Sequence, residues 1–373
     1  MKAISILLRA IFGGVFIFSG FVKAVDPWGT AYKIEEYIAV FGMNWLTDAI
    51  SFLPITLSIL LSSLEFMIGV LIFFGFFPKL SKYSAAIIMG FFTTLTFIDA
   101  LTNKVDDCGC FGDAIKLTNW ETFWKNIVLD VILVGIILLE RKMELSVSKI
   151  NSKLLTSVFG IFIIFFSIYS AVYEPVIDFR AWKIGNKMVP VGDDVTPPVS
   201  YAKYKNNSTG EIKEFTMEKL MEEYKVNPDF AKQWSFVDSR VENTNTVAAD
   251  GFSLTLLDMG EEDETIDILS DTTSDLYMIT SYDLRKANEK GLTKMLDYCE
   301  KLIEKGNRVL IVTATNTEGC AEFLEKYPKA NNFLIYSSDD KSIKTILRSN
   351  PGLIQISKGK VENKWSWRSL PTK

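Results

Sequence analysis

Apolar side chains are concentrated in five long runs in the first half of the chain. The runs cover about residues 4–24, 53–77, 83–101, 124–140 and 154–173. A helix needs roughly 17–25 predominantly apolar residues to cross the hydrocarbon core of a bilayer. The first run lacks a clear small-residue cleavage site and leads into further spans, so we interpret it as a retained helix rather than a signal peptide. The pattern predicts a multi-pass α-helical membrane bundle.

Basic residues between the runs predict the orientation of the bundle, because cytoplasmic loops carry an excess of Lys and Arg. They are Lys2 before the first run, Lys79 and Lys82 after the second, and Arg141, Lys142, Lys149 and Lys153 after the fourth. These positions fall on one side of the membrane and make the N-terminus cytoplasmic. The loops around 25–51 and 102–123, and all residues after 174, are then expected outside.

Beyond residue 173 the pattern becomes polar and alternates between short strands and helices. The first part predicts a hairpin of 201–204 and 211–215 around the turn 205–210, a helix at 217–224 and an extended segment at 234–242. The second part predicts a hairpin of 252–257 and 264–269 around Gly260, strands at 275–279, 309–313 and 333–336, helices at 287–305, 320–326 and 342–348, and a final hairpin of 353–356 and 360–365. This order predicts an α/β domain.

Ionisable residues inside the apolar runs are candidate functional residues, because charge is costly in hydrocarbon. They are Arg9, Lys23, Glu65, Asp99 and Asp130. Snorkelling or a place near the interface accounts for most of them. Glu65 differs because it lies near the middle of its run. It must be either paired with a cation from another helix or protonated.

The composition of the 373-residue chain reflects two parts of different character. Hydrophobic residues make up 48% of the chain and charged residues 23%. Residues 1–173 carry equal numbers of basic and acidic side chains, so the net charge of −5 arises in the rest of the chain. No basic surface for nucleic acid is indicated.

The chain contains no histidine. This absence excludes Ser-His-Asp and Cys-His nucleophilic sites, histidine-ligated haem and histidine-based zinc sites in this chain alone. Chemistry must therefore come from carboxylates, lysines, tyrosines, the four cysteines or a partner.

Cys108 and Cys110 flank a single glycine in the outward connection 102–123. Gly109 supplies backbone freedom, and a disulfide across one residue closes a small, tense ring, which favours a labile redox couple. A static disulfide that clips the loop is the alternative. Metal binding with the neighbouring aspartates is a weaker hypothesis, because two cysteines without histidine make a poor zinc site. No metal is expected.

The other two cysteines lie in predicted helices of the second half. Cys299, beside Tyr298 and Leu302, is expected to be a core thiol. Cys320 lies at a helix start and is expected to be a buried structural thiol. Disulfide exchange with Cys108 or Cys110 is the alternative, which would make Cys320 an accessory thiol.

The first part of the chain resembles the DoxX/MauE-type small membrane proteins over about residues 1–140. The resemblance rests on Arg9, Gly13-Gly14, Phe16, Ser19-Gly20, Lys23, Glu65 and Gly69, and on the runs Phe97–Asn103, Cys108–Asp113 and Leu117–Trp120. It implies a bundle with four helices, to which the fifth span is an addition. It also implies that Cys108 and Cys110 are a redox pair in periplasmic disulfide handling beside thioredoxin-like proteins, and that Arg9, Lys23, Glu65 and Asp99 are polar residues of the bundle core.

The order of strands and helices from about residue 251 is similar to a thioredoxin fold of the TlpA-like kind. The resemblance implies that Pro351 is the cis-proline of that fold. The stretch Thr280–Lys286 stands where the family carries its Cys-x-x-Cys pair, and it contains no cysteine. A fusion of these two parts is a type associated with Bacteroidota membrane proteins.

These observations divide the chain into four predicted regions. They are the bundle at 1–145, the fifth transmembrane helix at 146–177, a periplasmic linker with a hairpin at 178–250, and a thioredoxin-like domain without Cys-x-x-Cys at 251–373. The predicted localisation is the bacterial inner membrane, with a cytoplasmic N-terminus and a periplasmic C-terminal domain.

Two functional hypotheses stand close together. In the first, the protein is a thiol–disulfide oxidoreductase component that exchanges electrons through Cys108 and Cys110, with quinone as the candidate membrane carrier. In the second, it is a non-enzymatic envelope assembly or scaffold protein whose thioredoxin-like domain is an interaction module. Both imply the lipid bilayer and membrane or periplasmic proteins as partners. A third hypothesis, a lipid or small-molecule carrier, rests only on Arg9, Lys23 and Glu65.

Overall fold

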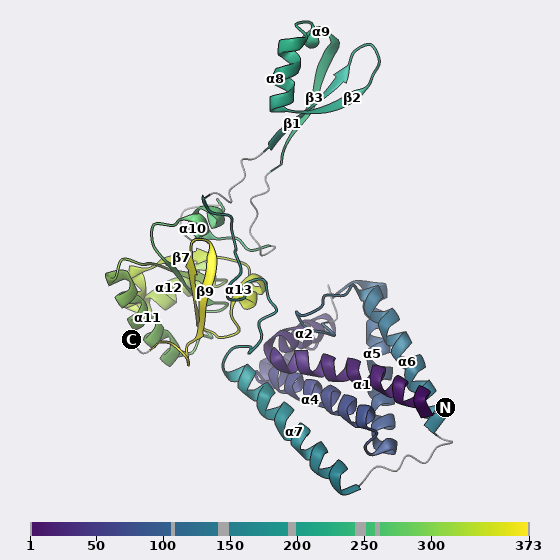
Figure 1. Cartoon of the computed structure of the whole chain (residues 1–373). Coiled ribbons are helices and arrows are strands. Elements are labelled where there is room, and N and C mark those ends of the chain that lie inside the picture. The colour runs from purple at the N-terminus through teal and green to yellow at the C-terminus, as the bar shows by residue number, and fades with distance from the viewer. Residues whose placement is uncertain are drawn as a thin grey trace. The chain divides into compact units, whose positions relative to one another are not determined.

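Five helices of the first half are long and apolar enough to cross a membrane (Figure 1). The computed structural model describes residues 2–105, 109–140, 149–192, 199–242, 251–257 and 262–371. The long helices are α1 (Lys2–Val25), α4 (Leu53–Phe74), α5 (Pro78–Thr102), α6 (Asn119–Glu140) and α7 (Lys149–Val172). They coincide with the five predicted apolar runs, so the prediction of a membrane helical bundle is confirmed.

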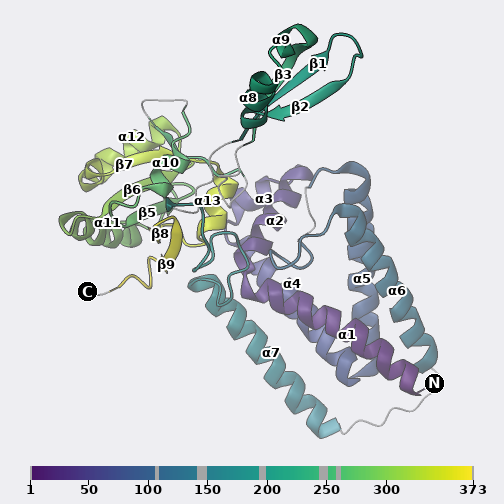
Figure 2. The ribbon, with the colours of Figure 1, turned by 45° about the horizontal axis from the view of Figure 1, so that its top comes forward.

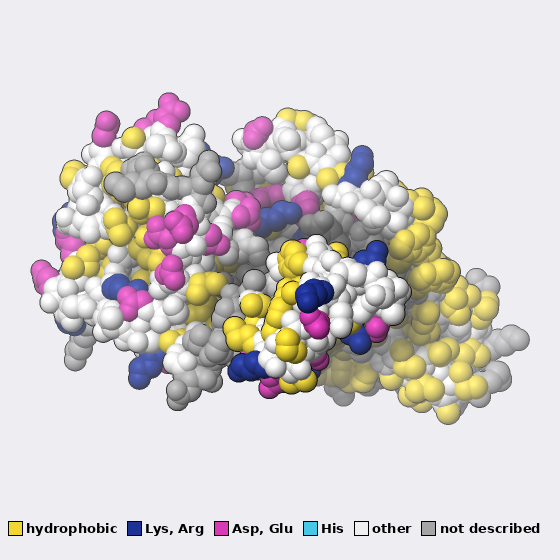
Figure 3. All heavy atoms as spheres, turned by 90° about the horizontal axis from the view of Figure 1, so that it is seen from above, with side chains coloured by type: hydrophobic (Ala, Val, Ile, Leu, Met, Phe, Trp, Pro, Cys, Tyr) yellow, Lys and Arg dark blue, Asp and Glu magenta, His cyan; other side chains and the backbone are white. Residues whose placement is uncertain are grey.

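Two apolar clusters hold this unit, residues 1–180, together. Phe12 of α1, Ile68 of α4 and Leu133 of α6 belong to the first cluster, and Phe66 of α4 with Ile163 of α7 to the second. Figures 1 and 2 show α1 and α4 packed side by side, with α5 and α6 as a second pair. On the face shown in Figure 3, hydrophobic side chains gather over these helices. An apolar exterior suits a lipid bilayer environment.

The connection between the first two spans is helical, contrary to the loop that the sequence predicts for residues 25–51. It contains α2 (Pro27–Val40) and the short α3 (Trp45–Ala49). Asp26 caps α2 by accepting a hydrogen bond from the Gly29 amide at 3.1 Å, and Pro27 fits the first helical turn, where no donor is needed.

The second unit, residues 181–373, contains a six-stranded mixed sheet. Its strands are β4 (Thr255–Leu256), β5 (Leu276–Ser281), β6 (Arg308–Thr313), β7 (Leu334–Ser337), β8 (Gly352–Ser357) and β9 (Lys360–Ser366), in the order β4-β7-β6-β5-β8-β9. Strands β5, β6 and β7 are parallel, whereas β4, β8 and β9 pair antiparallel with their neighbours. A C-terminal α/β region with a sheet is therefore confirmed.

Helices cover both faces of this sheet (Figure 2). They are α10 (Thr265–Ser270), α11 (Glu289–Glu304), α12 (Thr317–Lys326), the 3₁₀ helix η2 (Pro328–Asn332) and α13 (Asp340–Ile346). Along β5, Tyr277 and Ile279 pack towards α11 and α12, whereas Leu276 and Met278 pack towards α10 and α13. This alternation follows the two-residue period of a strand that is buried on both faces.

The predicted hairpin of 252–257 and 264–269 is wrong. Residues Thr265–Ser270 form α10, and β4 pairs with β7 instead. The Thr265 hydroxyl donates to the Asp263 carboxylate and accepts a hydrogen bond from the Leu254 amide. The hydrogen bond between Leu254 and Thr265 joins residues 252–257 to residues 264–269 without pairing them as strands. The turn residue Gly260 lies outside the described residues.

Residues 199–242 form a separate three-stranded antiparallel sheet. It contains β1 (Val199–Asn206), β2 (Ile212–Thr216), α8 (Met217–Val226), α9 (Phe230–Gln233) and β3 (Trp234–Glu242), with the strand order β2-β1-β3. Ala202, Phe215, Leu220 and Phe230 form its own small core. The predicted hairpin, helix and extended segment of this region are all confirmed.

Candidate functional site

The site in the membrane unit begins with a close approach of α1 and α4 at Gly20. A Cβ atom built on Gly20 would lie 2.3 Å from the amide nitrogen of Phe66. Only a glycine permits this approach. The approach brings the last turns of α1 against the middle of α4.

Lys23 and Glu65 form a buried ion pair at this helix contact. The Lys23 Nζ atom lies 2.6 Å from Glu65 Oε1 and 2.7 Å from Oε2, and the two residues are 5% and 1% exposed. Lys23 Nζ also lies 5.5 Å from the centre of the Phe92 ring. Each charge is therefore neutralised inside the bundle, which is the condition for burying ions.

Ser19 connects the ion pair to the cysteine loop. Its Oγ atom lies 2.7 Å from Glu65 Oε2 and 2.7 Å from the backbone carbonyl oxygen of Cys110. A hydroxyl carries one hydrogen, so Ser19 shares a single donor between these two acceptors. It also accepts a hydrogen bond from Lys23 Nζ at 3.2 Å. Ser19 thus holds the backbone of Cys110 next to the buried Lys23–Glu65 ion pair.

Two glycines shape the loop around Cys110. Gly109 and Gly112 have φ angles of 63° and 51°, in the left-handed region that favours glycine, and the Gly112 amide donates to the Gly109 carbonyl at 3.0 Å. Phe111 contacts Phe18 of α1 and lies under the Lys125 ammonium group, 4.6 Å from the ring centre. Residues 109–112 therefore fold as a tight turn packed on α1.

A cavity of about 600 Å³ lies beside this loop. Its walls come from α2, α3, α4 and α5, and Lys23, Gly109 and Cys110 also line it. Most of the lining side chains are apolar. The volume lies within the range of about 300–1,000 Å³ that is usual for small-molecule sites.

The predicted polar residues of the bundle do not form one cluster. Arg9 is buried at the opposite end of α1, where its Nε and Nη2 atoms donate to the carbonyl oxygens of Ile72 and Phe73 at 2.8 and 3.1 Å, the last turn of α4. Asp99 accepts a hydrogen bond from the Tyr37 hydroxyl. Only Lys23 and Glu65 lie together. Cys108, the other half of the predicted pair, lies outside the described residues.

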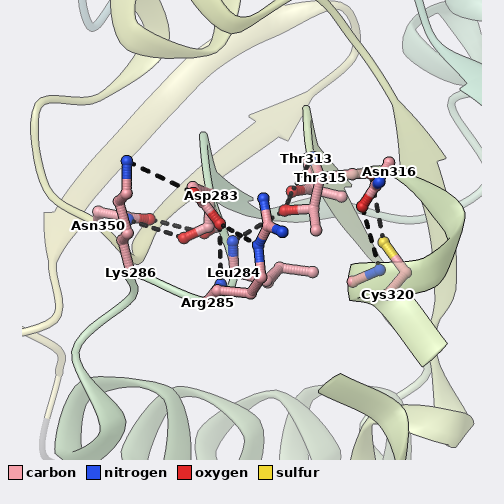
Figure 4. Close-up of polar contacts among 11 residues, drawn as sticks. Asp283, Leu284, Arg285, Lys286, Thr313, Thr315, Asn316, Cys320 and Asn350 are labelled. Carbon is pink, nitrogen blue, oxygen red and sulfur yellow. Dashed lines mark hydrogen bonds and ion pairs between the residues drawn. The ribbon is translucent and has the colours of Figure 1, made fainter. Parts of the chain in front are cut away.

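A second polar group lies at the carboxyl ends of β5 and β6, where ligands commonly bind in parallel sheets (Figure 4). Asp283 accepts hydrogen bonds from the amide and Nε of Arg285 at 3.0 and 3.3 Å, and the Lys286 ammonium lies 3.8 Å from its other oxygen. Asn350 donates to the Asp283 carbonyl at 3.1 Å. The Leu284 amide donates to the Thr315 hydroxyl at 2.9 Å.

The remaining predicted residues of the second unit are Cys320, Pro351 and Cys299. Cys320 is 1% exposed in the first turn of α12, with its sulfur 3.4 Å from the Thr315 carbonyl oxygen. The peptide bond between Asn350 and Pro351 is cis. Cys299 is fully buried, as expected, and burial raises the pKa of its thiol to about 12.

Sequence reasoning did not select Ser19, Thr30 or Tyr37 as site residues. The position of Ser19 four residues before Lys23 was an available signal, because these two positions share a helix face. Thr30 and Tyr37 lie in a segment that the sequence predicts as a loop, so no periodic signal pointed to them.

The long apolar helices, with a neutralised ion pair inside the bundle, define a multi-pass membrane protein. Residues 1–139 match the family model described as methylamine utilisation protein MauE. This match ends with the fourth span and leaves out α7 and the second unit. No curated protein and no solved structure matches the chain.

Proposed function

We propose that this protein is a membrane component of thiol–disulfide exchange in which Cys108 and Cys110 are the redox pair. The observation that carries the proposal is the position of Cys110. Its backbone is hydrogen-bonded to Ser19 of the buried Lys23–Glu65 cluster, and it borders the large cavity of the bundle. The match to the MauE family fits a membrane-associated accessory role.

A dithiol of a partner protein gives two electrons and two protons to the Cys108–Cys110 disulfide, so that an S–S bond breaks in this chain and forms in the partner. The reduced pair then passes the two electrons and two protons to an acceptor in the membrane. A thiolate is the attacking group in each exchange step, and no histidine is required.

Lys23, Glu65 and Ser19 are proposed as positioning residues. Ser19 touches the loop at the Cys110 carbonyl oxygen, and Glu65 and Lys23 are hydrogen-bonded to the Ser19 hydroxyl. Their role is to hold the loop against α1 at the wall of the cavity. A loop held by buried groups has its geometry fixed before a partner arrives.

We further propose that residues 251–373 have a thioredoxin-like fold without its own dithiol and that they dock partners. The support is the strand order β7-β6-β5-β8-β9, with helices on both faces and the loop Thr280–Lys286 at the carboxyl end of β5. This loop contains no cysteine. The redox chemistry is therefore assigned to the membrane unit.

The proposed placement of the protein is the bacterial inner membrane. The support is the distribution of basic residues between the five spans, which favours a cytoplasmic N-terminus. The Cys110 loop and the second unit would then face the periplasm, an oxidising compartment in which disulfides persist.

A scaffold role is the second candidate, and one observation favours it. In the loop after β5, the Asp283 carboxylate and the Leu284 amide both form hydrogen bonds within the domain. A loop of this kind fits an interaction module as well as a former redox site. In that case the cysteine loop would be static.

Trapping of a mixed disulfide tests the redox proposal. In Cys110→Ser, the Cys108 thiolate can attack the disulfide of an oxidised partner, which is the reverse of the proposed exchange, and Cys110 is no longer present to displace the partner from the mixed disulfide. We expect an adduct in membranes that a reducing agent removes, at the same size in a background with Cys299→Ala and Cys320→Ala. The matched control is Cys108→Ser/Cys110→Ser, which should give no adduct. Adduct formation that is equal in the control would contradict the proposal.

A further inference from the structure

The hydroxyl groups that line the cavity of the membrane unit are already used or buried. The Tyr37 hydroxyl donates to the Asp99 carboxylate, and the Thr94 hydroxyl donates to the Gly90 carbonyl oxygen at 2.8 Å. The Oγ1 atom of Thr30 has almost no exposed surface. Among the residues that the structure describes, the lining therefore presents no hydroxyl donor to a polar ligand.

The two lysines of the lining are paired with carboxylates. Lys23 Nζ lies 2.6 and 2.7 Å from the two carboxylate oxygens of Glu65, and Lys33 Nζ lies 3.1 Å from the Glu36 carboxylate. Both ammonium groups are neutralised, so the lining does not present a net positive charge to an anion. A hydrocarbon chain needs neither a hydrogen-bond partner nor a counter-charge, and it is the ligand chemistry that this lining favours.

Several apolar side chains belong both to the cavity and to the surface of the bundle. Phe41 at the end of α2, Leu57 of α4, and Phe91 and Ile98 of α5 line the cavity and are between 39% and 58% exposed. The last three lie in helices that are long and apolar enough to cross a membrane, so a bilayer around the spans covers them. The cavity is therefore continuous with the lipid-facing surface, and a lipid chain reaches it without crossing water.

The connection of α2 and α3, which forms one wall of the cavity, has an apolar surface of its own. Trp45 and Phe52 are 65% and 66% exposed, and Met43 and Ile50 are exposed between residues 41 and 52 as well. Exposed tryptophan and large apolar side chains beside a span are typical of the membrane interface. This wall therefore also faces lipid, which makes the bilayer the source of the ligand.

We propose that this cavity binds one acyl chain of a membrane phospholipid, with the headgroup left at the rim. A cavity of about 600 Å³ is far larger than the water-sized voids of a close-packed interior, so it needs an occupant. Phe92 lines the cavity, and the Lys23 ammonium group lies over its ring, 5.5 Å from the centre. A chain packed on Phe92 keeps water away from the Lys23–Glu65 pair, which strengthens the attraction between the two charges. Binding of the chain does not involve the cysteine pair, so the site is independent of the proposed function.

Photocrosslinking of a lipid chain tests the site in the full-length protein. The protein is placed in phosphatidylcholine nanodiscs that contain a phosphatidylcholine with a diazirine at the end of one acyl chain, and mass spectrometry of peptides locates the adducts. We expect adducts on Ile38 of α2, which lines the cavity and is 7% exposed, besides those on Val131 of α6, which is 68% exposed to bulk lipid. Leu61→Trp and Leu95→Trp, which fill the cavity, should each lower the Ile38 adducts about tenfold and leave the Val131 adducts unchanged.

Val158→Trp on α7 is the matched control, because this side chain is exposed and lies outside the lining. It adds the same bulk and should give Ile38 adducts like the wild type. Leu61 and Leu95 border an open volume that can accept a larger side chain. Both filling variants should therefore melt like Val158→Trp in detergent, which separates a filled cavity from a misfolded bundle.

Three results would overturn the lipid site. They are the absence of adducts on Ile38 where Val131 is labelled, Ile38 adducts that stay at the wild-type level in both filling variants, and a water-soluble diazirine that labels Ile38 more strongly than the lipid probe does. The first and the third are measured on the wild type, so they decide the question even where a filling variant does not fold. A cysteine pair that never changes its redox state would contradict the proposed function and leave the lipid site unaffected.

Discussion

Lys23 and Glu65 place opposite charges inside the membrane unit, each almost fully buried. The sequence identifies both residues because an ionisable side chain inside an apolar run is rare. It does not identify their pairing, because the pairing depends on how closely α1 and α4 approach at Gly20. The sequence allowed a cationic partner or a protonated state for Glu65, and the structure shows the cationic partner.

Removal of one partner of this pair should destabilise the protein strongly. Glu65→Leu or Lys23→Met leaves one buried charge uncompensated, which costs about 3–5 kcal/mol. The double variant Lys23→Met/Glu65→Leu removes both charges and should recover a large part of this loss. Thermal unfolding in detergent, with the four proteins side by side, measures the difference. A double variant at least as unstable as the sum of the single variants would contradict the buried pair.

The buried thiol of Cys299 predicts a pH dependence of stability. Its pKa of about 12 in the folded protein lies above the unfolded value of about 8.5. Its contribution is therefore fully present below about pH 8.5 and is lost as pH rises towards 12, because only the unfolded thiol ionises in that window. Between pH 8.0 and 9.5 the free energy of unfolding should fall by about 1.2 kcal/mol more in the wild type than in Cys299→Ala.

Pulse proteolysis of the full-length protein in urea, with detection of the residues around α11, measures this difference. Only the pH dependence of the free energy of unfolding is compared between the two proteins, so the pH-independent change that Cys299→Ala itself causes in this free energy cancels. Equal pH dependence in the two proteins would show that the Cys299 thiol is not buried in the way described.

At the scale of the element, long or strongly patterned segments are predictable and short ones are not. Strand β3 (Trp234–Glu242) has the bounds that the sequence predicts, and the five spans follow from apolar length. For residues 264–269 the sequence predicts a strand and the structure has a helix, because Ile266 and Ile268 alternate with polar residues over only six positions. A segment this short fits both a strand and one helical turn, and its side-chain contacts decide between them.

The candidate site was also predictable only where its residues lie in long or strongly patterned segments. The spans placed Lys23 and Glu65 in the bundle, and the Cys-Gly-Cys-Phe-Gly run marked the loop. The cavity was not predictable, because α2 lies in a connection whose helical pattern is weak. Its Thr30 and Tyr37 side chains reach the site only through the packing of α2 on the bundle.

Close packing of α1 on α4 gives a matched pair of glycine variants. Gly20→Ala places a methyl group against the Phe66 backbone and should lower stability by about 1–3 kcal/mol or more. A Cβ atom on Gly14 of the same helix would meet no atom within 4 Å, so Gly14→Ala should be neutral or stabilising by up to about 1 kcal/mol. Melting temperatures in detergent measure both. A Gly20→Ala protein as stable as Gly14→Ala would contradict the helix contact.

At the scale of the whole molecule, the chain joins an apolar bundle of balanced charge to an acidic second half. This division explains how a protein with 48% hydrophobic residues also carries 23% charged residues. The family match covers the bundle and not the second unit.

The basic residues between the spans predict the orientation of the whole chain, with the second unit in the periplasm. We expect alkaline phosphatase fused after Lys373 to be active and green fluorescent protein at the same position to be dark, because the first needs the periplasm and the second the cytoplasm. The reverse pattern would contradict a periplasmic second unit. A fusion after residue 148, behind the fourth span, should give the opposite result and serves as the internal control.

The central claim is that the Cys108–Cys110 pair changes its redox state. Acid quenching of whole cells followed by a maleimide mass tag measures this state most directly, in a Cys299→Ala/Cys320→Ala background where only the pair can be labelled. We predict a mixture of disulfide and dithiol that moves towards the dithiol when respiration is blocked. A pair that stays fully oxidised with and without respiration would contradict the account.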